Sequence, residues 1–297
     1  MPQLPTPRQT ATQYNRRRMS IVAVLGAGPI GAGVAHALAR HARVRDVRLS
    51  DSAGSVARGK ALDIRQSGPV EGFDTRVAGE DDVLAAVAAD VIVVADEHEQ
   101  GPWDGDRGLA MLARLRRSGA TAPLVLAAPG QWWLAEAAVR EAGVAADAIV
   151  GASAGAMAGA ARALAALEIE GSGVDVTLPV CGRPPRFTLG WSSAMVGQSL
   201  AADRIPPHRQ RAVSDHLAAH WPPGPYAIAT VTAPIVEGLL TGTRRDVCGV
   251  TVLDGELGVR GVACLLPLTL GHRRVLARRI PSLSPQERTA LLSGLSA

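Results

Sequence analysis

The sequence predicts an α/β fold in which a doubly wound parallel sheet is followed by a second, α+β domain. Two observations carry this prediction. Up to about residue 151, short apolar runs alternate with helix-forming segments, which is the pattern of parallel strands joined by helices. The first run breaks directly into a glycine-rich turn, GAGPIGAG, ahead of the first helix. A chain of 297 residues that is 47% hydrophobic and 20% charged is long and apolar enough to bury a large core.

The first elements form a strand–helix–strand unit. SIVAVL (20–25) is a β-branched strand, VAHALARHA (34–42) has the apolar spacing of a helix, and VRDVRLSD (44–51) returns to strand character. Further along, ADVIVVAD (89–96) is continuously apolar, as expected for a parallel strand buried on both faces. The other predicted elements of this half are a helix at 55–67, a strand at 74–79, a helix at 107–118, a strand at 122–129, a helix at 131–142 and a strand at 148–153.

The second half of the chain has a different texture. Its predicted helices are the alanine-rich GAMAGAARALAALEI (155–169) and YAIATVTAPIVEGLLTG (226–242), and its strand-like runs are VDVTLPV (174–180), DVCGVTVLDG (246–255) and RGVACLLPLTLG (260–271). This mixture is typical of an α+β domain that carries substrate contacts. We therefore expect a basic, disordered N-terminal extension (1–18), a sheet domain (19–151) and an α+β domain (152–297).

The composition argues against several classes of function. A formal net charge of +4 without a basic stripe that interleaves with aromatic residues disfavours a nucleic-acid partner. We expect no membrane partner, since no apolar run reaches the length of a membrane span, and the polar N-terminus lacks the apolar segment of a secretory signal. Three widely spaced cysteines favour a cytoplasmic location over a disulfide framework. His216 and His220 lie one helical turn apart without an apparent third ligand, so no metal is expected.

The glycine turn has the spacing of a dinucleotide-binding turn. It reads G-x-G-x-x-G between a predicted strand and a predicted helix. Gly26 permits the tight turn, Gly28 lets the backbone approach a pyrophosphate, and Gly31 allows close packing of helix on strand. Pro29 and Ile30 complete the turn, where the N-terminus of the helix offers free N–H groups to phosphate.

Asp51 supports the same interpretation. It closes the second predicted strand, where a carboxylate accepts hydrogen bonds from both ribose hydroxyls and repels a 2′-phosphate. The sequence therefore predicts a Rossmann-type domain over 19–151 that binds NAD rather than NADP. A glycine-rich turn with a purely structural role is the alternative.

Several further segments resemble the lactate/malate dehydrogenase family over about residues 20–295. They are GKALDIRQSGPVEGF (59–73), PYAIATVTAPIVEGLL (225–240) and LPLTLGHRRVLARRIPSLSPQERTALLSGL (266–295). The resemblance implies a lactate/malate dehydrogenase-like fold, an NAD cofactor and hydride transfer to or from a small 2-oxo or 2-hydroxy acid. It also implies assembly through the helices at 55–67 and 155–169 into a homodimer or a dimer of dimers, with Ala163 or Ala166 near the contact.

The family's catalytic groups are only partly present. Arg107, in the loop that resembles the family's mobile substrate loop, matches the arginine that polarises the substrate carbonyl. The segment VCGRPPRF (180–187) resembles the turn that carries the proton-shuttling histidine, and that position reads Arg183. The positions of the partner aspartate and of the carboxylate-binding arginine read Met157 and Ala160. A guanidinium does not deprotonate at working pH, so Arg183 can bind an anion but cannot shuttle a proton.

Two functional hypotheses follow. In the first, the chain is an NAD-dependent oxidoreductase with an altered, anionic substrate, a 2-oxo or 2-hydroxy acid or a related carbonyl or imine. Arg107 and Arg183 then contact the substrate, and His98, in the same loop as Arg107, is a candidate replacement acid. In the second, the chain is a catalytically silent NAD-binding protein with a regulatory or scaffolding role. Retention of Arg107 favours the first hypothesis. The joint loss of the histidine and the aspartate is compatible with both hypotheses and does not distinguish them.

Overall fold

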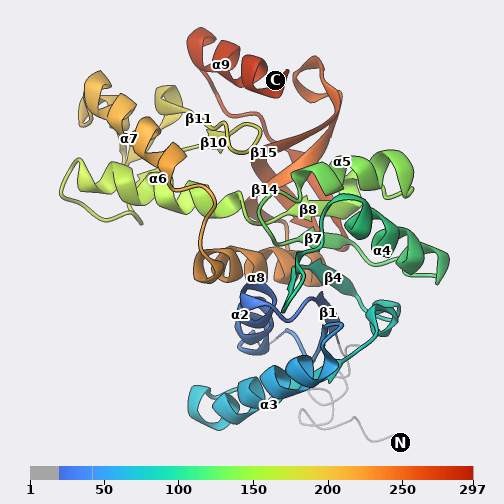
Figure 1. Ribbon diagram of the computed structural model, residues 1–297. Coiled ribbons are helices and arrows are strands. Elements are labelled where there is room, and N and C mark those ends of the chain that lie inside the picture. The colour runs from blue at the N-terminus through green and yellow to red at the C-terminus, as the bar shows by residue number, and fades with distance from the viewer. Residues whose placement is uncertain (1–19, 42, 297) are drawn as a thin grey trace, which may run out of the picture.

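In the computed structural model, residues 20–41 and 43–296 are described, and the predicted N-terminal extension lies outside them. One nine-stranded sheet runs through the molecule (Figure 1). In spatial order its strands are β16 (Arg274–Arg278), β15 (Arg260–Gly271), β14 (Arg245–Asp254), β8 (Ile149–Gly151), β7 (Leu124–Leu126), β4 (Val91–Val94), β1 (Ile21–Leu25), β2 (Asp46–Ser50) and β3 (Arg76–Glu80).

The six strands of the first half are parallel, as the sequence predicts. β1 pairs with β2 on one side and β4 on the other, so the chain order reverses at β1. This is the doubly wound arrangement of a Rossmann-type sheet, in which ligands bind beyond the carboxyl ends of the strands where the order reverses. Three antiparallel strands, β14 to β16, extend the same sheet beyond β8, through a pair between Val250 and Gly151.

The helices cover both faces of the sheet and extend beyond it. They are α2 (Pro29–Ala39), α3 (Gly54–Glu71), α4 (Gly105–Arg117), α5 (Trp132–Glu141), α6 (Gly155–Leu167), α7 (Pro207–Ala219), α8 (Pro225–Thr241) and α9 (Pro285–Leu295). Alternation along β1 explains how both faces become apolar. Val22 and Val24 join a core with α2, α3 and α8, whereas Ala23 and Leu25 join a core with α4 and α5.

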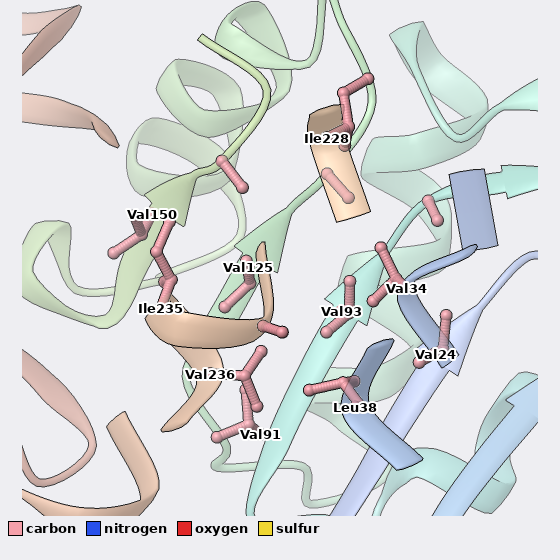
Figure 2. Close-up of a cluster of buried hydrophobic side chains, with 14 of the residues drawn as sticks. Val24, Val34, Leu38, Val91, Val93, Val125, Val150, Ile228, Ile235 and Val236 are labelled. Atoms are coloured by element: carbon pink, nitrogen blue, oxygen red, sulfur yellow. The ribbon is translucent and has the colours of Figure 1, made fainter. Parts of the chain in front are cut away.

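The first of these cores contains residues of both halves of the chain. Figure 2 shows Val24, Val34 and Leu38 packed near Ile228 and Val236 of α8. A helix of the second half therefore covers part of the sheet of the first. A third core lies among α6, α7 and the small sheets of the second half.

Short strands form the remaining sheets. β5 (Asp96–Glu97) and β6 (Gly101–Pro102) make a hairpin directly after β4. The predicted strand at 174–180 is instead two short strands, β9 (Val176–Thr177) and β10 (Val180–Cys181), which separate around Pro179, a residue without an N–H donor. β10 pairs with β11 (Thr188–Leu189), and β9 and β13 (Ser199–Leu200) flank β12 (Met195–Val196).

Helix α6 buries much of its alanine surface within the subunit. Ala161, Ala165 and Ala166 are all buried, whereas Ala163 is exposed. Of the two alanines expected near a subunit contact, Ala166 packs in the third core and only Ala163 is exposed at the surface. Among the described helices, none is long and apolar enough to cross a membrane.

Candidate NAD site and active site

The glycine turn lies between the carboxyl end of β1 and the start of α2. Gly26 has a φ of +110°, which favours glycine, and a Cβ at this position would overlap the Asp96 backbone. A Cβ on Gly31 would overlap the carbonyl of Gly26, so glycine is required for close packing of helix on strand. Pro29 is the first residue of α2, where its missing N–H costs nothing.

Asp51 follows β2 and reaches across to the glycine turn. Its side chain is buried, and Oδ2 accepts hydrogen bonds from the N–H groups of Ala27 (2.6 Å) and His98 (2.9 Å). Oδ1 accepts one from Ala53 N–H at 2.9 Å. Asp51 therefore ties together the turn, the start of α3 and the loop that contains His98.

A second carboxylate occupies the start of α2. Asp96 is buried, and its Oδ1 accepts a hydrogen bond from Gly31 N–H (2.8 Å) and its Oδ2 one from Ile30 N–H (3.3 Å). The Asp96 carbonyl accepts a further bond from Gly28 N–H at 2.7 Å. A Cβ on Gly28 would overlap the Asp96 carboxyl group, so glycine at this position gives room to the chain's own side chain. No local sequence pattern indicates this role of Asp96, because its partners lie 65 and 66 residues away.

These contacts decide how the turn relates to a dinucleotide. The positions of the glycines and of Asp51 fit a dinucleotide-binding turn. The N–H groups of Ile30 and Gly31, which would face a phosphate, are bonded to Asp96 in this arrangement. The glycines and Asp51 therefore fit the cofactor, whereas the N–H groups that would bind its phosphate are occupied by the carboxylate of Asp96.

Arg107 is engaged by its own loop. Its guanidinium forms an ion pair with Glu97 and donates to Gln100 Oε1 (3.0 Å) and to the Pro102 carbonyl (2.6 Å). It also lies over the ring of Trp103, 4.4 Å from the ring centroid. Arg107 thus holds the β5–β6 hairpin together.

His98 lies in the same hairpin with an exposed side chain. Its backbone N–H donates to Asp51, so the hairpin is attached to the cofactor turn through its main chain. The imidazole remains at the surface beyond the carboxyl end of β4, which is the end of the sheet where ligands bind in this class of fold.

Arg183 lies in the turn between β10 and β11, which confirms the turn predicted for RPPR. Its Nη2 lies 3.1 Å from Glu136 Oε1, and its guanidinium carbon lies 4.4 Å from the Trp132 ring centroid. Glu136 also accepts a hydrogen bond from Ala263 N–H of β15 at 2.8 Å. Arg183 therefore joins its turn to α5 and, through Glu136, to the sheet. The side-chain partners of Arg183 are not those of Arg107.

Met157 and Ala160, the two other positions that the resemblance assigns to catalytic groups, carry no charge. Met157 is fully buried in the third core, and Ala160 is partly buried on the same helix. Arg162 is exposed, and its Nε donates to the Gly173 carbonyl at 3.2 Å. A narrow cavity with room for about one water molecule lies at the ends of β7 and β8, beside the start of α5 and the turn that contains Arg183. It is lined by Ala128, Gln131, Trp132, Ser153, Pro184 and Trp221.

Gln131 is a polar residue of this region that sequence reasoning missed. It is buried, accepts a hydrogen bond from Ala128 N–H (2.9 Å) and donates to the Trp103 carbonyl (2.8 Å). It therefore connects the loop after β7 to the loop after β4. A glutamine just before a helix has no pattern that would reveal these partners.

Cys181 and the histidines of α7 have simple environments. Cys181 is buried, and burial, followed by the neighbouring thiols of Cys248 and Cys264, raises its pKa well above the usual range, so it packs as a small apolar residue. His220 Nδ1 lies 2.8 Å from the His216 carbonyl. Within residues 20–41 and 43–296, no group of three or more histidine, cysteine, aspartate or glutamate side chains is placed to hold a metal.

The sheet order, the glycine turn and Asp51 together define a Rossmann-type dinucleotide-binding protein. Residues 20–105 match the model of the lactate/malate dehydrogenase NAD-binding domain. The malate dehydrogenase of Thermomicrobium roseum is 28% identical over 295 residues, which cover 93% of this chain and 94% of the relative. That of Chlorobium phaeobacteroides is 25% identical over 289 residues, which cover 91% and 93%.

Solved structures agree with these matches. The malate dehydrogenase of Salinibacter ruber superimposes with a TM-score of 0.82 at 23% identity, over 93% of this chain and 94% of that one. The minor L-lactate dehydrogenase of Enterococcus mundtii gives 0.82 at 18% identity, over 94% and 96%. The chain is therefore similar to the lactate/malate dehydrogenase family over nearly its whole length, and these matches support NAD as its cofactor. Its relatives are dehydrogenases, which supports an oxidoreductase.

Proposed function

We propose that this chain is an NAD-binding member of the family that has lost malate and lactate turnover and acts as a catalytically silent NAD-binding protein. The observation that carries the proposal is the environment of Arg183, at the position expected for the proton-shuttling histidine. Its guanidinium is paired with Glu136 and stacked on Trp132. A paired guanidinium neither exchanges a proton near neutral pH nor offers a free charge to a substrate carboxylate.

The environment of Arg107 supports the same proposal. From sequence alone, retention of this arginine favours a working enzyme, because a silent protein has no need for a carbonyl-polarising group. In the structure Arg107 has another purpose, since it bonds Glu97 and the carbonyl groups of its own hairpin. Its retention is therefore accounted for without a substrate.

The second candidate is an NAD-dependent oxidoreductase with an altered anionic substrate. The dehydrogenase relatives favour it, as does the exposed imidazole of His98 beyond the carboxyl end of β4. In this candidate His98 supplies the proton that the missing relay would have supplied.

Turnover measurements separate the two candidates. NADH oxidation is followed with oxaloacetate, pyruvate, aldehydes and imines, alongside a family dehydrogenase as reference. We expect oxaloacetate and pyruvate reduction to be at least about 10²–10⁴-fold slower than the reference, the usual cost of a lost general acid. Brisk reduction of either would contradict the proposal. The second candidate would be established if the chain reduces another carbonyl or imine and His98→Gln abolishes that turnover. His208→Gln, at an exposed histidine of α7, is the control and should leave the turnover intact.

Cofactor preference tests the role of Asp51. We expect tighter binding of NADH than of NADPH, because the Asp51 carboxylate disfavours a second negative group at the ribose. Fluorescence titration with both nucleotides measures the two dissociation constants. Equal affinities would contradict the contact of Asp51 with the ribose but would not contradict NAD binding itself.

A further inference from the structure

We propose that Asp96 is a built-in competitor of the cofactor, whose carboxylate occupies the phosphate-binding end of α2 and so sets the affinity for NAD. The inference rests on the NAD binding of the proposed function and adds the residue that controls it. Asp96 acts on NAD binding through the N–H groups that would receive the phosphate.

The geometry of Asp96 is that of an anion bound to a helix N-terminus. One carboxylate oxygen bonds Gly31 N–H and the other Ile30 N–H, at 2.8 and 3.3 Å. These N–H groups lie in the first turn of an 11-residue helix, where the backbone dipoles favour a negative charge. Asp96 is buried, so its charge is compensated by this helix end. A phosphate needs the same N–H groups and has the same sign of charge.

The hairpin holds Asp96 in this place. The Asp96 carbonyl accepts Gly28 N–H at 2.7 Å, and the next residue, Glu97, accepts Ser52 N–H at 3.2 Å. Arg107 pairs with Glu97 and bonds the Pro102 carbonyl across the hairpin. Phosphate entry therefore requires the Asp96 carboxylate to move away from the N–H groups of Ile30 and Gly31, while these bonds hold its backbone beside them. The chain binds NAD through the fraction of molecules in which this movement has occurred, which lowers the observed affinity by that fraction.

The main test compares NADH binding by the full chain and by two variants. Asp96→Ala removes the carboxylate, whereas Asp96→Asn removes the charge and keeps an oxygen for Gly31 N–H. Asp106→Asn is the matched control, because it removes one negative charge from an exposed position on the first turn of α4. Fluorescence titration at fixed ionic strength gives each dissociation constant, and circular dichroism and thermal melts establish that each variant is folded.

We expect Asp96→Ala to bind NADH about tenfold more tightly than the unaltered chain, or more. The reason is that about 10% or less of the unaltered molecules are in the state that binds NADH, whereas all molecules of the variant are. Asp96→Asn should tighten binding less, and Asp106→Asn should leave it unchanged. A purely structural role would lower the melting temperature of Asp96→Ala without changing its affinity for NADH. Equal dissociation constants for the unaltered chain and a folded Asp96→Ala or Asp96→Asn would overturn the inference and leave NAD binding intact.

Inorganic pyrophosphate provides a second measurement. It should raise the melting temperature of Asp96→Asn and Asp96→Ala more than that of the unaltered chain, because the N–H groups of α2 are then open to it. Absence of NADH binding in the folded variants and in the unaltered chain would overturn both this inference and the NAD binding on which it rests.

Discussion

Arg183 and Glu136 form an ion pair that is largely shielded from water. Their side chains are 21% and 10% exposed, and Glu136 also receives the N–H of Ala263 in the sheet. The cost of removing two charges from water is offset by their mutual attraction and by these hydrogen bonds. The pair therefore stabilises the fold only as long as both members are present, and the Arg183 side chain is part of the structure of the RPPR turn.

Removing one member of the pair should be costly. We expect Arg183→Ala to lower the free energy of unfolding by about 3 kcal/mol, because Glu136 is left as an uncompensated buried charge. Urea denaturation measures the change, with Arg186→Ala, at an exposed arginine of the same turn, as the control. Adding Glu136→Gln to Arg183→Ala should recover part of the loss. Equal effects of Arg183→Ala and Arg186→Ala would contradict the role of the pair.

At the scale of elements, α9 is attached to the body of the molecule by its N-terminal cap. Ser284 caps the helix and accepts a hydrogen bond from Glu287 N–H, while the Glu287 carboxylate accepts the N–H groups of Ser284 and Ser192. Partial burial raises the pKa of Glu287, but the hydrogen bonds from Ser192 and Ser284 together outweigh it and hold the pKa below its usual range. The ionised carboxylate thus joins α9 to the segment after β11.

This attachment should weaken in acid. A carboxyl with a lowered pKa in the folded state contributes stability above its unfolded pKa, about 4.3, and loses it as the pH falls through the folded value. We therefore expect Glu287→Gln to be less stable than the unaltered chain at pH 7, with a difference that shrinks as the pH is lowered below about 4. Urea denaturation across this range measures it. A difference that is independent of pH would exclude ionisation of Glu287 as the cause.

The elements show what local sequence can and cannot predict. Strand β1, the glycine turn and α2 follow from apolar spacing and from the conformational freedom of glycine, which are properties of neighbouring residues. Asp96 lies 65 residues from Gly31, and Arg183 lies 47 from Glu136, so their partners are set by the fold and leave no trace in spacing. For the same reason, local sequence could not predict that β14 pairs with β8 and continues the sheet beyond the predicted parallel strands.

At the scale of the whole molecule, the two halves of the chain are built on one sheet. β14 to β16 extend the strands of the first half, and α8 packs against the core of β1 and α2. We retain the division near residue 151 as a proposal about function, with the cofactor turn before it and Arg183 after it. The continuous sheet fixes the positions of the two regions relative to each other.

Assembly is the remaining property at this scale. The residues exposed on the subunit surface limit where a contact between subunits can lie. The alanines of α6 that pack inward explain part of its composition without a partner. What remains exposed on the two helices expected at the interface includes Leu62 of α3, 50% exposed, and Leu167 of α6, 74% exposed. Exposed leucines on both helices favour an apolar contact, and a two-fold homodimer is the simplest closed assembly in which one surface contacts its own copy.

We predict that the chain is a homodimer, or a dimer of such dimers, and that Leu62→Arg and Leu167→Arg each weaken it, because a charge would be buried in an apolar contact. Light scattering coupled to gel filtration at micromolar concentration measures the mass, which should fall toward that of the 30.7 kDa chain in both variants. Leu276→Arg is the control, since Leu276 is 42% exposed on β16 and away from both helices. A monomer mass for the unaltered chain would contradict the dimer. An unchanged mass for both helix variants would show that the contact lies on another face of the subunit.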